Sequence, residues 1–348
     1  SAERVQLARL VLIGSGVIGY AGGLGMKYAT GLEPAERKVS WAGPAFATVF
    51  YAAALYHWAP IEVSPIGWAI WALVLLEVGL RLRWIEIRVL AYALATAAVG
   101  LCAALQDTIW VATPGASPWQ YTALVALLLH VLAWRVAVPG TELAKPEERL
   151  SVSPLVAGGG LYAAATWALL PGPLVAFSWM VWALAINEVG RRIRREDVSL
   201  SALAMGAISF AFTLLANVYD IVPLEPASRA IQLVGFAGVV TGLYALHARA
   251  RKTPGSPTLL KVSEGGAFLH LGTVLFATVL WHELPSVAVA VAWGALAFVF
   301  IELSDRVEKS ALVRQAQVLL LAAVIRLFFA NFVVFGETFG LSHRVVTV

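Results

Sequence analysis

Charge is scarce in this chain. Only 13% of its 348 residues are charged, whereas 60% are hydrophobic. A soluble domain carries roughly 25% charged and 45–50% apolar residues. A water-soluble fold of this size could not bury so much apolar surface, but a bilayer accepts helices that are apolar on every side. The composition therefore excludes an ordinary soluble domain and favours a membrane protein.

Cysteine and catalytic motifs are lacking too. Cys102 is the single cysteine, which excludes an internal disulfide framework and a cysteine-based metal cluster. The sequence has no metal-binding motif, no glycine-rich nucleotide loop after a strand and no nucleophile elbow. No loop is long enough to hold a catalytic domain, and the first apolar run lacks a cleavage site for a signal peptide. We therefore expect neither a catalytic site nor a cofactor.

What the chain does contain is a series of apolar runs. A spanning helix needs about 20 mostly apolar residues. About twelve runs meet or approach this length, and thirteen tryptophans suit two interfacial belts. The predicted spans are 6–28, 42–59, 64–82, 88–107, 118–138, 153–170, 174–192, 198–219, 228–248, 264–284, 286–304 and 311–332.

Lysine and arginine gather in alternate loops. They follow the predicted spans 64–82, 174–192 and 286–304, whereas the opposite loops 107–118 and 220–227 contain none. Cytoplasmic loops carry the excess of basic residues, so these loops should be cytoplasmic and both chain ends outside. The net charge of +4 thus reflects membrane topology, and we expect no nucleic-acid partner. We predict the bacterial cytoplasmic (inner) membrane as the location.

The chain contains three copies of one sequence pattern. A Glu-x-x-x-Arg motif on a tryptophan-containing run occurs at Glu77, Glu188 and Glu302, with spacings of 111 (188 − 77) and 114 (302 − 188). Three further landmarks keep the same spacings: Pro60, Pro171 and Pro285; Trp68, Trp179 and Trp293; and Gln106, Asn217 and Asn331. Four landmarks in register predict three copies of one four-helix unit.

An even number of spans per copy makes the repeats parallel rather than inverted. We therefore predict an all-α, polytopic transmembrane helical bundle of about twelve spans in three parallel tandem four-helix repeats. The expected domains are repeat 1 over 1–115, repeat 2 over 116–225 and repeat 3 over 226–341. Residues 342–348 resemble the start of a further repeat, so we expect the native chain to be longer.

The repeated motifs favour structural roles. Glu and Arg at i and i+4 share a helix face and can pair, which predicts the ion pairs Glu77–Arg81, Glu188–Arg192 and Glu302–Arg306. Such pairs suit the cytoplasmic helix ends, although a proton or substrate relay is the alternative. The tryptophans at 68, 179 and 293 are predicted to anchor the opposite interface, and the amides at 106, 217 and 331 to cap helices or bond between them.

Two residues break the repeat. Arg326 stands where the other copies have Leu101 and Phe212, and His270 stands in place of Ala45 and Val156. A cation inside a span needs a partner, and Glu337 and Glu283 are the candidates for Arg326. We therefore take Arg326 and His270 as a candidate lipid or substrate site, with a structural pair or snorkelling as the alternative.

The histidines have two interpretations. His130 also lies within a predicted span. No two histidines share a helix at ligand spacing, which favours hydrogen-bonded histidines over haem or pigment ligands. Whether His130 or His270 binds a cofactor stays open at this point.

The run Trp179–Leu184 with Glu188–Arg192 resembles the DUF2339 family of bacterial multi-spanning membrane proteins. The resemblance extends over nearly the whole chain and implies a helical membrane fold, but that family has no assigned activity to transfer.

The sequence features are compatible with three functions. Even repetition favours a non-enzymatic membrane scaffold or accessory subunit, whose partners are membrane lipids and other membrane subunits. The alternative is a transporter or lipid-handling protein with a site near Arg326 and His270. An envelope glycosyl- or acyltransferase is the third, and only His282-Glu283 offers it an acid and a histidine in an outer loop.

Overall fold

The fold is taken from a computed structural model of the whole chain. It describes residues 2–29, 33, 39–112, 118–138, 143, 147, 150–193, 195–218, 228–250, 266–304, 309–332, 337–338 and 341–342. For some of these, including Gln106, Asn217 and Asn331, only the backbone is described. The described chain forms two compact units, residues 1–169 and 170–348, which we call unit 1 and unit 2.

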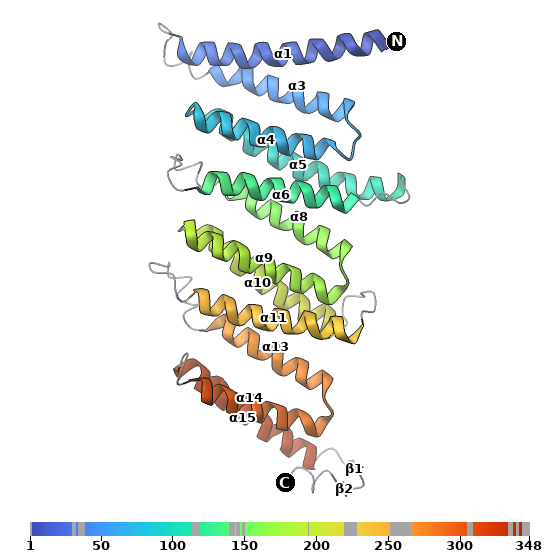
Figure 1. Ribbon diagram of the computed structural model, residues 1–348, viewed down its shortest axis with the longest axis vertical. Helices are drawn as coiled ribbons and strands as arrows, with labels where there is room; N and C mark the ends of the chain where they lie inside the picture. The colour runs from blue at the N-terminus through green and yellow to red at the C-terminus, as the bar shows by residue number, and fades with distance from the viewer. Residues whose placement is uncertain are drawn as a thin grey trace. The chain divides into compact units, whose positions relative to one another are not determined.

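Unit 1 is a stack of helices. Its elements are α1 (Ala2–Tyr28), a 3₁₀ turn η1 (Val39–Trp41), α3 (Ala42–Trp58), α4 (Ser64–Arg81), α5 (Ile85–Ala112), α6 (Pro118–Ala137) and α8 (Ser153–Leu169). Neighbouring pairs pack along their lengths: α1 on α3, α4 on α5, and α6 on α8 (Figure 1). Helix α4 also packs on α6, and these contacts bury a core that includes Leu76, Ile87, Leu129 and Leu132.

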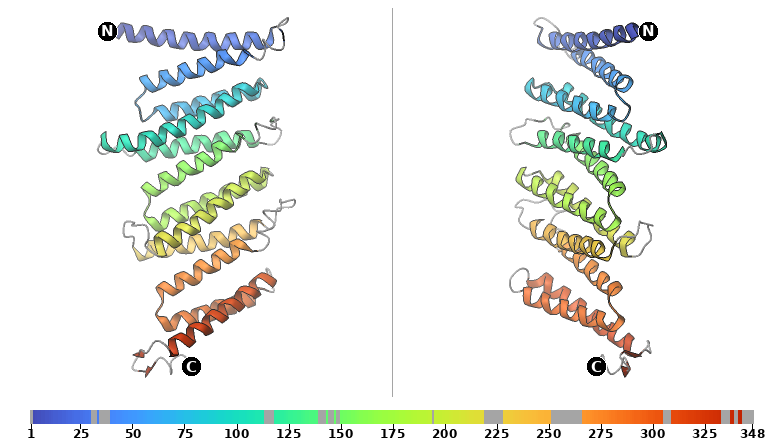
Figure 2. Two further views of the ribbon diagram at one scale, coloured as in Figure 1. Left: turned by 180° about the vertical axis from the view of Figure 1, so that it is seen from behind. Right: turned by 45° about the vertical axis from the view of Figure 1, so that its right-hand side comes forward.

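Unit 2 has the same character. It contains α9 (Gly172–Ile193), α10 (Glu196–Phe212), a π-helical turn η2 (Thr213–Val218), α11 (Arg229–Ala250), α13 (Ala267–Glu283), α14 (Ser286–Ser304) and α15 (Lys309–Phe332). Figures 1 and 2 show α11 between α9 and α13, with α14 packed on α15. Two short strands, β1 (Glu337–Thr338) and β2 (Leu341–Ser342), pair antiparallel near the end of the chain. The described part of the chain thus holds twelve α-helices, which confirms the predicted all-helical, multi-helix class.

Three prolines begin helices at matched places. The N–H of Val63 bonds to the Pro60 carbonyl at 2.9 Å, that of Leu174 to Pro171 at 2.9 Å, and that of Val289 to Pro285 at 3.2 Å. Proline lacks an N–H and has φ fixed near the helical value, so it fits a first turn but not a helix interior. Each proline therefore lies in the turn that separates one helix from the next.

Two glycines let paired helices cross closely at a second kind of turn. The Trp84 N–H bonds to the Gly79 carbonyl at 2.8 Å, and the Arg195 N–H bonds to Gly190 at 2.9 Å. A Cβ on Gly79 would lie 2.5 Å from Cγ of Arg88, and one on Gly190 would lie 2.8 Å from the Ser199 backbone nitrogen. A larger residue at either position would push the following helix away.

The outer surface of the helices is apolar. Ile18, Phe46, Val291 and Val318 are each about two-thirds or more exposed. Monomeric soluble proteins rarely expose contiguous apolar patches of this kind, whereas lipid tails solvate them. Within the described residues, eight helices are long and apolar enough to cross a membrane, and the part Ala288–Ser304 of α14 is a shorter apolar segment. These helices support the membrane-like class. Helices α8 and α13 have 17 residues each and are shorter than the spanning helices.

The division between the units falls inside the expected second repeat, 116–225. Packing units and sequence repeats need not coincide, because α6 contacts α4 of the preceding expected repeat as well as α8 of its own. Of the segment expected to begin a further repeat, Ser342 belongs to β2 and residues 343–348 lie outside the described residues.

Candidate functional site

The predicted ion pair of α4 is present and has an additional partner. Arg81 Nε lies 2.9 Å from Glu77 Oε1, as the i, i+4 spacing predicts. Arg135 on α6 lies 2.9 Å from Glu77 Oε2, so the same carboxylate also links two helices. Arg81 is 77% exposed, and exposed pairs contribute little to stability. The cross-helix partner was missed because its sequence separation of 58 residues leaves no local signal.

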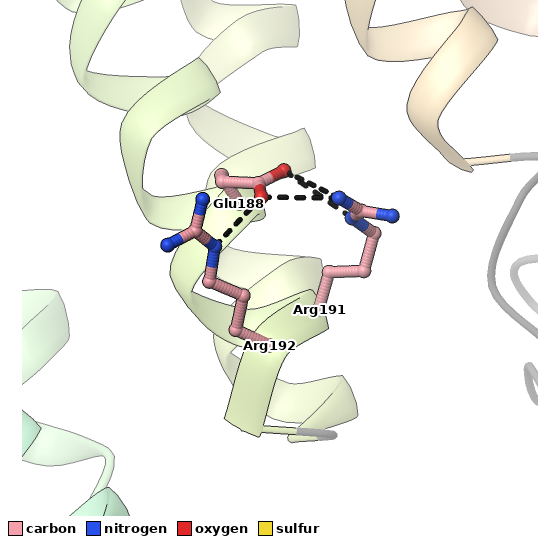
Figure 3. Close-up of polar contacts among 3 residues, drawn as sticks. All are labelled: Glu188, Arg191 and Arg192. Atoms are coloured by element: carbon pink, nitrogen blue, oxygen red, sulfur yellow. Dashed lines mark hydrogen bonds and ion pairs between the residues drawn. The ribbon is translucent and has the colours of Figure 1, made fainter.

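The pair on α9 also gains a second arginine. Figure 3 shows Glu188 held between Arg192, whose Nε lies 2.8 Å from Oε1, and Arg191, whose terminal nitrogen lies 3.0 Å from both carboxylate oxygens. All three residues lie at the exposed end of one helix, which suits orientation rather than chemistry. The third predicted pair, Glu302–Arg306, cannot be followed because Arg306 lies outside the described residues.

The repeated tryptophans lie between helices. Trp179 and Trp293 are buried, with 6% and 7% exposure, whereas an interfacial anchor should present its ring to headgroups. The indole N–H of Trp68 donates to the Ala52 carbonyl at 2.9 Å, and that of Trp293 donates to Ala277 at 3.0 Å. Both bonds join a helix to the one before it, so these rings fasten neighbouring helices together.

A groove of about 830 Å³ runs along α13, α14 and α15 within unit 2, and we call it the unit 2 groove. Its walls are mainly apolar and include Val274, Ala277, Val318 and Leu319. Polar side chains enter at one end from His270, Arg314 and Gln315, and at the other from Trp281 and His282. An apolar groove with polar ends is complementary to an amphipathic, lipid-like molecule.

A chain of hydrogen bonds lies beneath the first end of this groove. The Thr273 hydroxyl donates to Gln315 Oε1 at 2.6 Å, and Gln315 Nε2 lies 3.0 Å from His270 Nδ1. The Tyr244 hydroxyl lies 3.2 Å from Thr273 Oγ1 and donates to it. Because Gln315 donates through Nε2, His270 Nδ1 accepts, and the neutral imidazole carries its hydrogen on Nε2. His270 therefore offers a hydrogen-bond donor that its partners inside the bundle do not use.

Arg326 lies at the other end. Its guanidinium carbon is 4.3 Å from the centre of the Trp281 ring, and Trp281 lines the groove. The two expected carboxylate partners are not seen with it. Glu283 pairs instead with Arg229 at 3.1 Å, and the side chain of Glu337 lies outside the described residues. Arg326 and His270 thus lie near opposite ends of one groove, and in the described part of the chain they do not contact each other or a common residue.

Unit 1 contains a matching groove, of about 540 Å³, along α3, α4 and α5. We call it the unit 1 groove. Every residue that lines it has a counterpart in the unit 2 groove 225 positions later, as with Trp68 and Trp293 (293 − 68 = 225). Even the internal hydroxyl pair recurs, with Tyr20 bonded to Thr48 at 2.7 Å.

The two linings differ mainly in polarity. Ala45, Ala53 and Leu90 of the unit 1 groove correspond to His270, Thr278 and Gln315 of the unit 2 groove. Arg314 lines only the unit 2 groove. Gln315 could have been found from sequence by the comparison that singled out His270, because Leu90 and Ser201 stand at the matching positions.

A buried ion pair was also missed. Arg88 Nε lies 2.9 Å from Glu147 Oε1 in unit 1, and the Tyr92 hydroxyl donates to the same oxygen at 3.2 Å. Glu147, which lies between α6 and α8, is only 1% exposed. Within the bundle, His130 Nδ1 lies 2.6 Å from the Ala126 carbonyl of its own helix, the contact of a hydrogen-bonded structural histidine.

Among the described residues, no group of three or more His, Cys, Asp or Glu side chains is arranged to hold a metal ion. The unit 2 groove presents hydrogen-bond donors beside apolar walls. Comparisons with family models, with curated proteins and with solved structures find no match to this chain.

Proposed function

We propose that this chain is a lipid-handling membrane protein that holds a membrane amphiphile in the unit 2 groove. The observation that carries the proposal is the selective polarity of that groove. The two grooves match position by position, yet the His270 imidazole, the Gln315 amide and the Thr278 hydroxyl replace apolar residues of the unit 1 groove. Structural packing alone would not require these differences, because the unit 1 groove packs without them.

The repeat architecture belongs to the same proposal. We infer three parallel tandem repeats, 1–115, 116–225 and 226–341, in about twelve spans. The matched grooves, the equivalent tryptophan bonds and the three helix-starting prolines support this inference. The resemblance to the DUF2339 family stays a prediction within it.

The location and orientation are proposed as well. The asymmetry of lysine and arginine favours a bacterial inner membrane with the basic loops in the cytoplasm. In a Cys102→Ala background, single cysteines at Ala112 and Ala227 should react with an impermeant reagent in sealed cells. A cysteine at Ala144 should not react, and its labelling would reject this orientation.

A non-enzymatic scaffold is the second candidate. It is favoured by the surface ion pairs, in which Arg81 and Arg192 are about three-quarters exposed and at helix ends. Under this proposal the groove would be filled only by exchangeable bilayer lipid. Co-purification of fixed partner subunits from native membrane would favour the scaffold.

A groove-filling substitution distinguishes the lipid-handling proposal from the scaffold proposal. Ala322→Phe should fill the unit 2 groove, and Ala97→Phe is the matched control because it fills the unit 1 groove at the equivalent position. Protein purified in a non-ionic detergent would be analysed by native mass spectrometry for retained lipid. We expect Ala322→Phe to lose a tightly held lipid that Ala97→Phe keeps. Identical lipid content in both variants and the wild type would refute the lipid-handling proposal.

A further inference from the structure

Arg326 lies beside one end of the unit 2 groove, over the ring of the lining residue Trp281. It lies in a stretch apolar enough to cross a membrane, Ala311–Phe328, one helical turn after the groove residue Ala322. Residues i and i+4 share a helix face, so the arginine continues the groove wall. Its guanidinium stacks on Trp281, which holds one face of the cation.

The charge of Arg326 is not balanced within the described residues. The nearby carboxylate of Glu283 is paired with Arg229, and no described carboxylate lies within ion-pair distance of Arg326. Its Nε is buried without a hydrogen-bond partner among the described residues. A charged group in an apolar span is costly unless an anion or water satisfies it. The matching positions hold Leu101 and Phe212, so packing at this site does not require arginine.

We propose that the Arg326–Trp281 end of the groove binds the phosphate of an anionic phospholipid, whose acyl chain lies along the groove toward His270. This assignment rests on the proposed lipid-handling function. A guanidinium binds phosphate through two parallel hydrogen bonds and keeps its charge at any working pH. His282, which lines the same end, is placed to interact with the headgroup. From Trp281 to His270 the helix rises about 16 Å, which gives the chain a continuous apolar wall.

A phospholipid fits better than free phosphate. The cation lies at the end of an apolar trough, inside a membrane-like stretch, where a soluble anion would have to leave water. Burying the ligand's own apolar chain in the groove offsets that cost. The anionic group and the apolar chain that fills the groove therefore belong to one ligand.

The test uses the full chain reconstituted in vesicles of mixed phosphatidylglycerol and phosphatidylcholine, then extracted in a non-ionic detergent. Native mass spectrometry gives the ratio of the two lipids retained. Wild type should retain phosphatidylglycerol in excess. Arg326→Leu, which installs the residue found at position 101, should fold normally but lower the ratio about tenfold or more, as expected for lost charge-assisted hydrogen bonds. Arg326→Lys should fall between them.

Arg192→Leu is the matched control, because it removes an exposed cation of unit 2 that is not among the residues lining the groove. An unchanged ratio in Arg326→Leu, or an equal fall in Arg192→Leu, would overturn the headgroup assignment. If Ala322→Phe still abolishes lipid retention in that case, the lipid-handling function survives and only this assignment fails. Loss of bound phosphatidylglycerol on adding inorganic phosphate would overturn the choice of a phospholipid.

Glu337→Gln tests whether the Glu337 carboxylate is the ion-pair partner of Arg326. We expect it to change neither the lipid ratio nor thermal unfolding. A loss of stability in Glu337→Gln that Arg326→Leu rescues would identify Glu337 as the partner of the cation and would overturn the proposal.

Discussion

The pair formed by Arg88 and Glu147 offers the clearest energetic prediction for unit 1. Both side chains are almost inaccessible, with 8% and 0% exposure, and the contact distance is 2.9 Å. Removing one member of a buried pair leaves the other charge uncompensated and costs about 3–5 kcal/mol. Glu147→Gln keeps the size of the side chain and an oxygen for the Tyr92 hydroxyl. We therefore expect a loss near the lower end of that range.

Thermal unfolding in detergent, followed by tryptophan fluorescence, measures this effect. For a domain of about this size each kcal/mol shifts the midpoint by about 2–4 °C, so Glu147→Gln should unfold roughly 6 to 12 °C earlier. Trp84 is 2% exposed and one turn before Arg88, which makes it a local reporter. The double variant Arg88→Leu, Glu147→Leu removes both charges and should recover most of the loss. A Glu147→Gln midpoint within a degree of wild type, or no recovery in the double variant, would refute the reasoning.

Three further predictions concern other contacts. Glu188→Gln should leave the unfolding midpoint nearly unchanged, because the carboxylate and its arginines lie at an exposed helix end, and a drop of several degrees would contradict this. Gly19→Leu should destabilise the protein by about 1–3 kcal/mol, since a Cβ there would lie 2.7 Å from a carbonyl oxygen of the facing helix. Gly22→Leu is its control, with open space around that position, and equal midpoints would contradict the close packing. Trp293→Phe and Trp68→Phe should each cost about 0.5–1.5 kcal/mol through one lost hydrogen bond, and clearly unequal losses would count against their equivalence.

Local features of this protein could be predicted from its sequence. The apolar runs predicted the helices, because the length and composition of a run are properties of that segment alone. The contact from Arg192 to Glu188 follows from helical spacing, and it is present at 2.8 Å. The repeat comparison singled out His270, and the structure puts that residue in a groove.

Contacts between distant segments could not be predicted in this way. Arg135 reaches Glu77 across 58 residues, and Gln315 reaches His270 across 45. Such pairings depend on which helix faces meet, and one sequence does not specify this. The tryptophans illustrate the same limit, because Trp293 occupies the predicted helix end yet faces its neighbouring helix instead of the bilayer surface.

The direction of the hydrogen-bond chain from Tyr244 to His270 has a practical consequence for purification. Both ends of the unit 2 groove present donors, the imidazole N–H at one and the guanidinium at the other. Under the lipid-binding proposal, detergents with anionic heads would compete for these donors and displace the proposed lipid, and those with quaternary ammonium heads would be repelled at Arg326. Neutral sugar detergents offer only weak acceptors. If the groove binds this lipid, the solubilising agent therefore decides whether the isolated protein retains it.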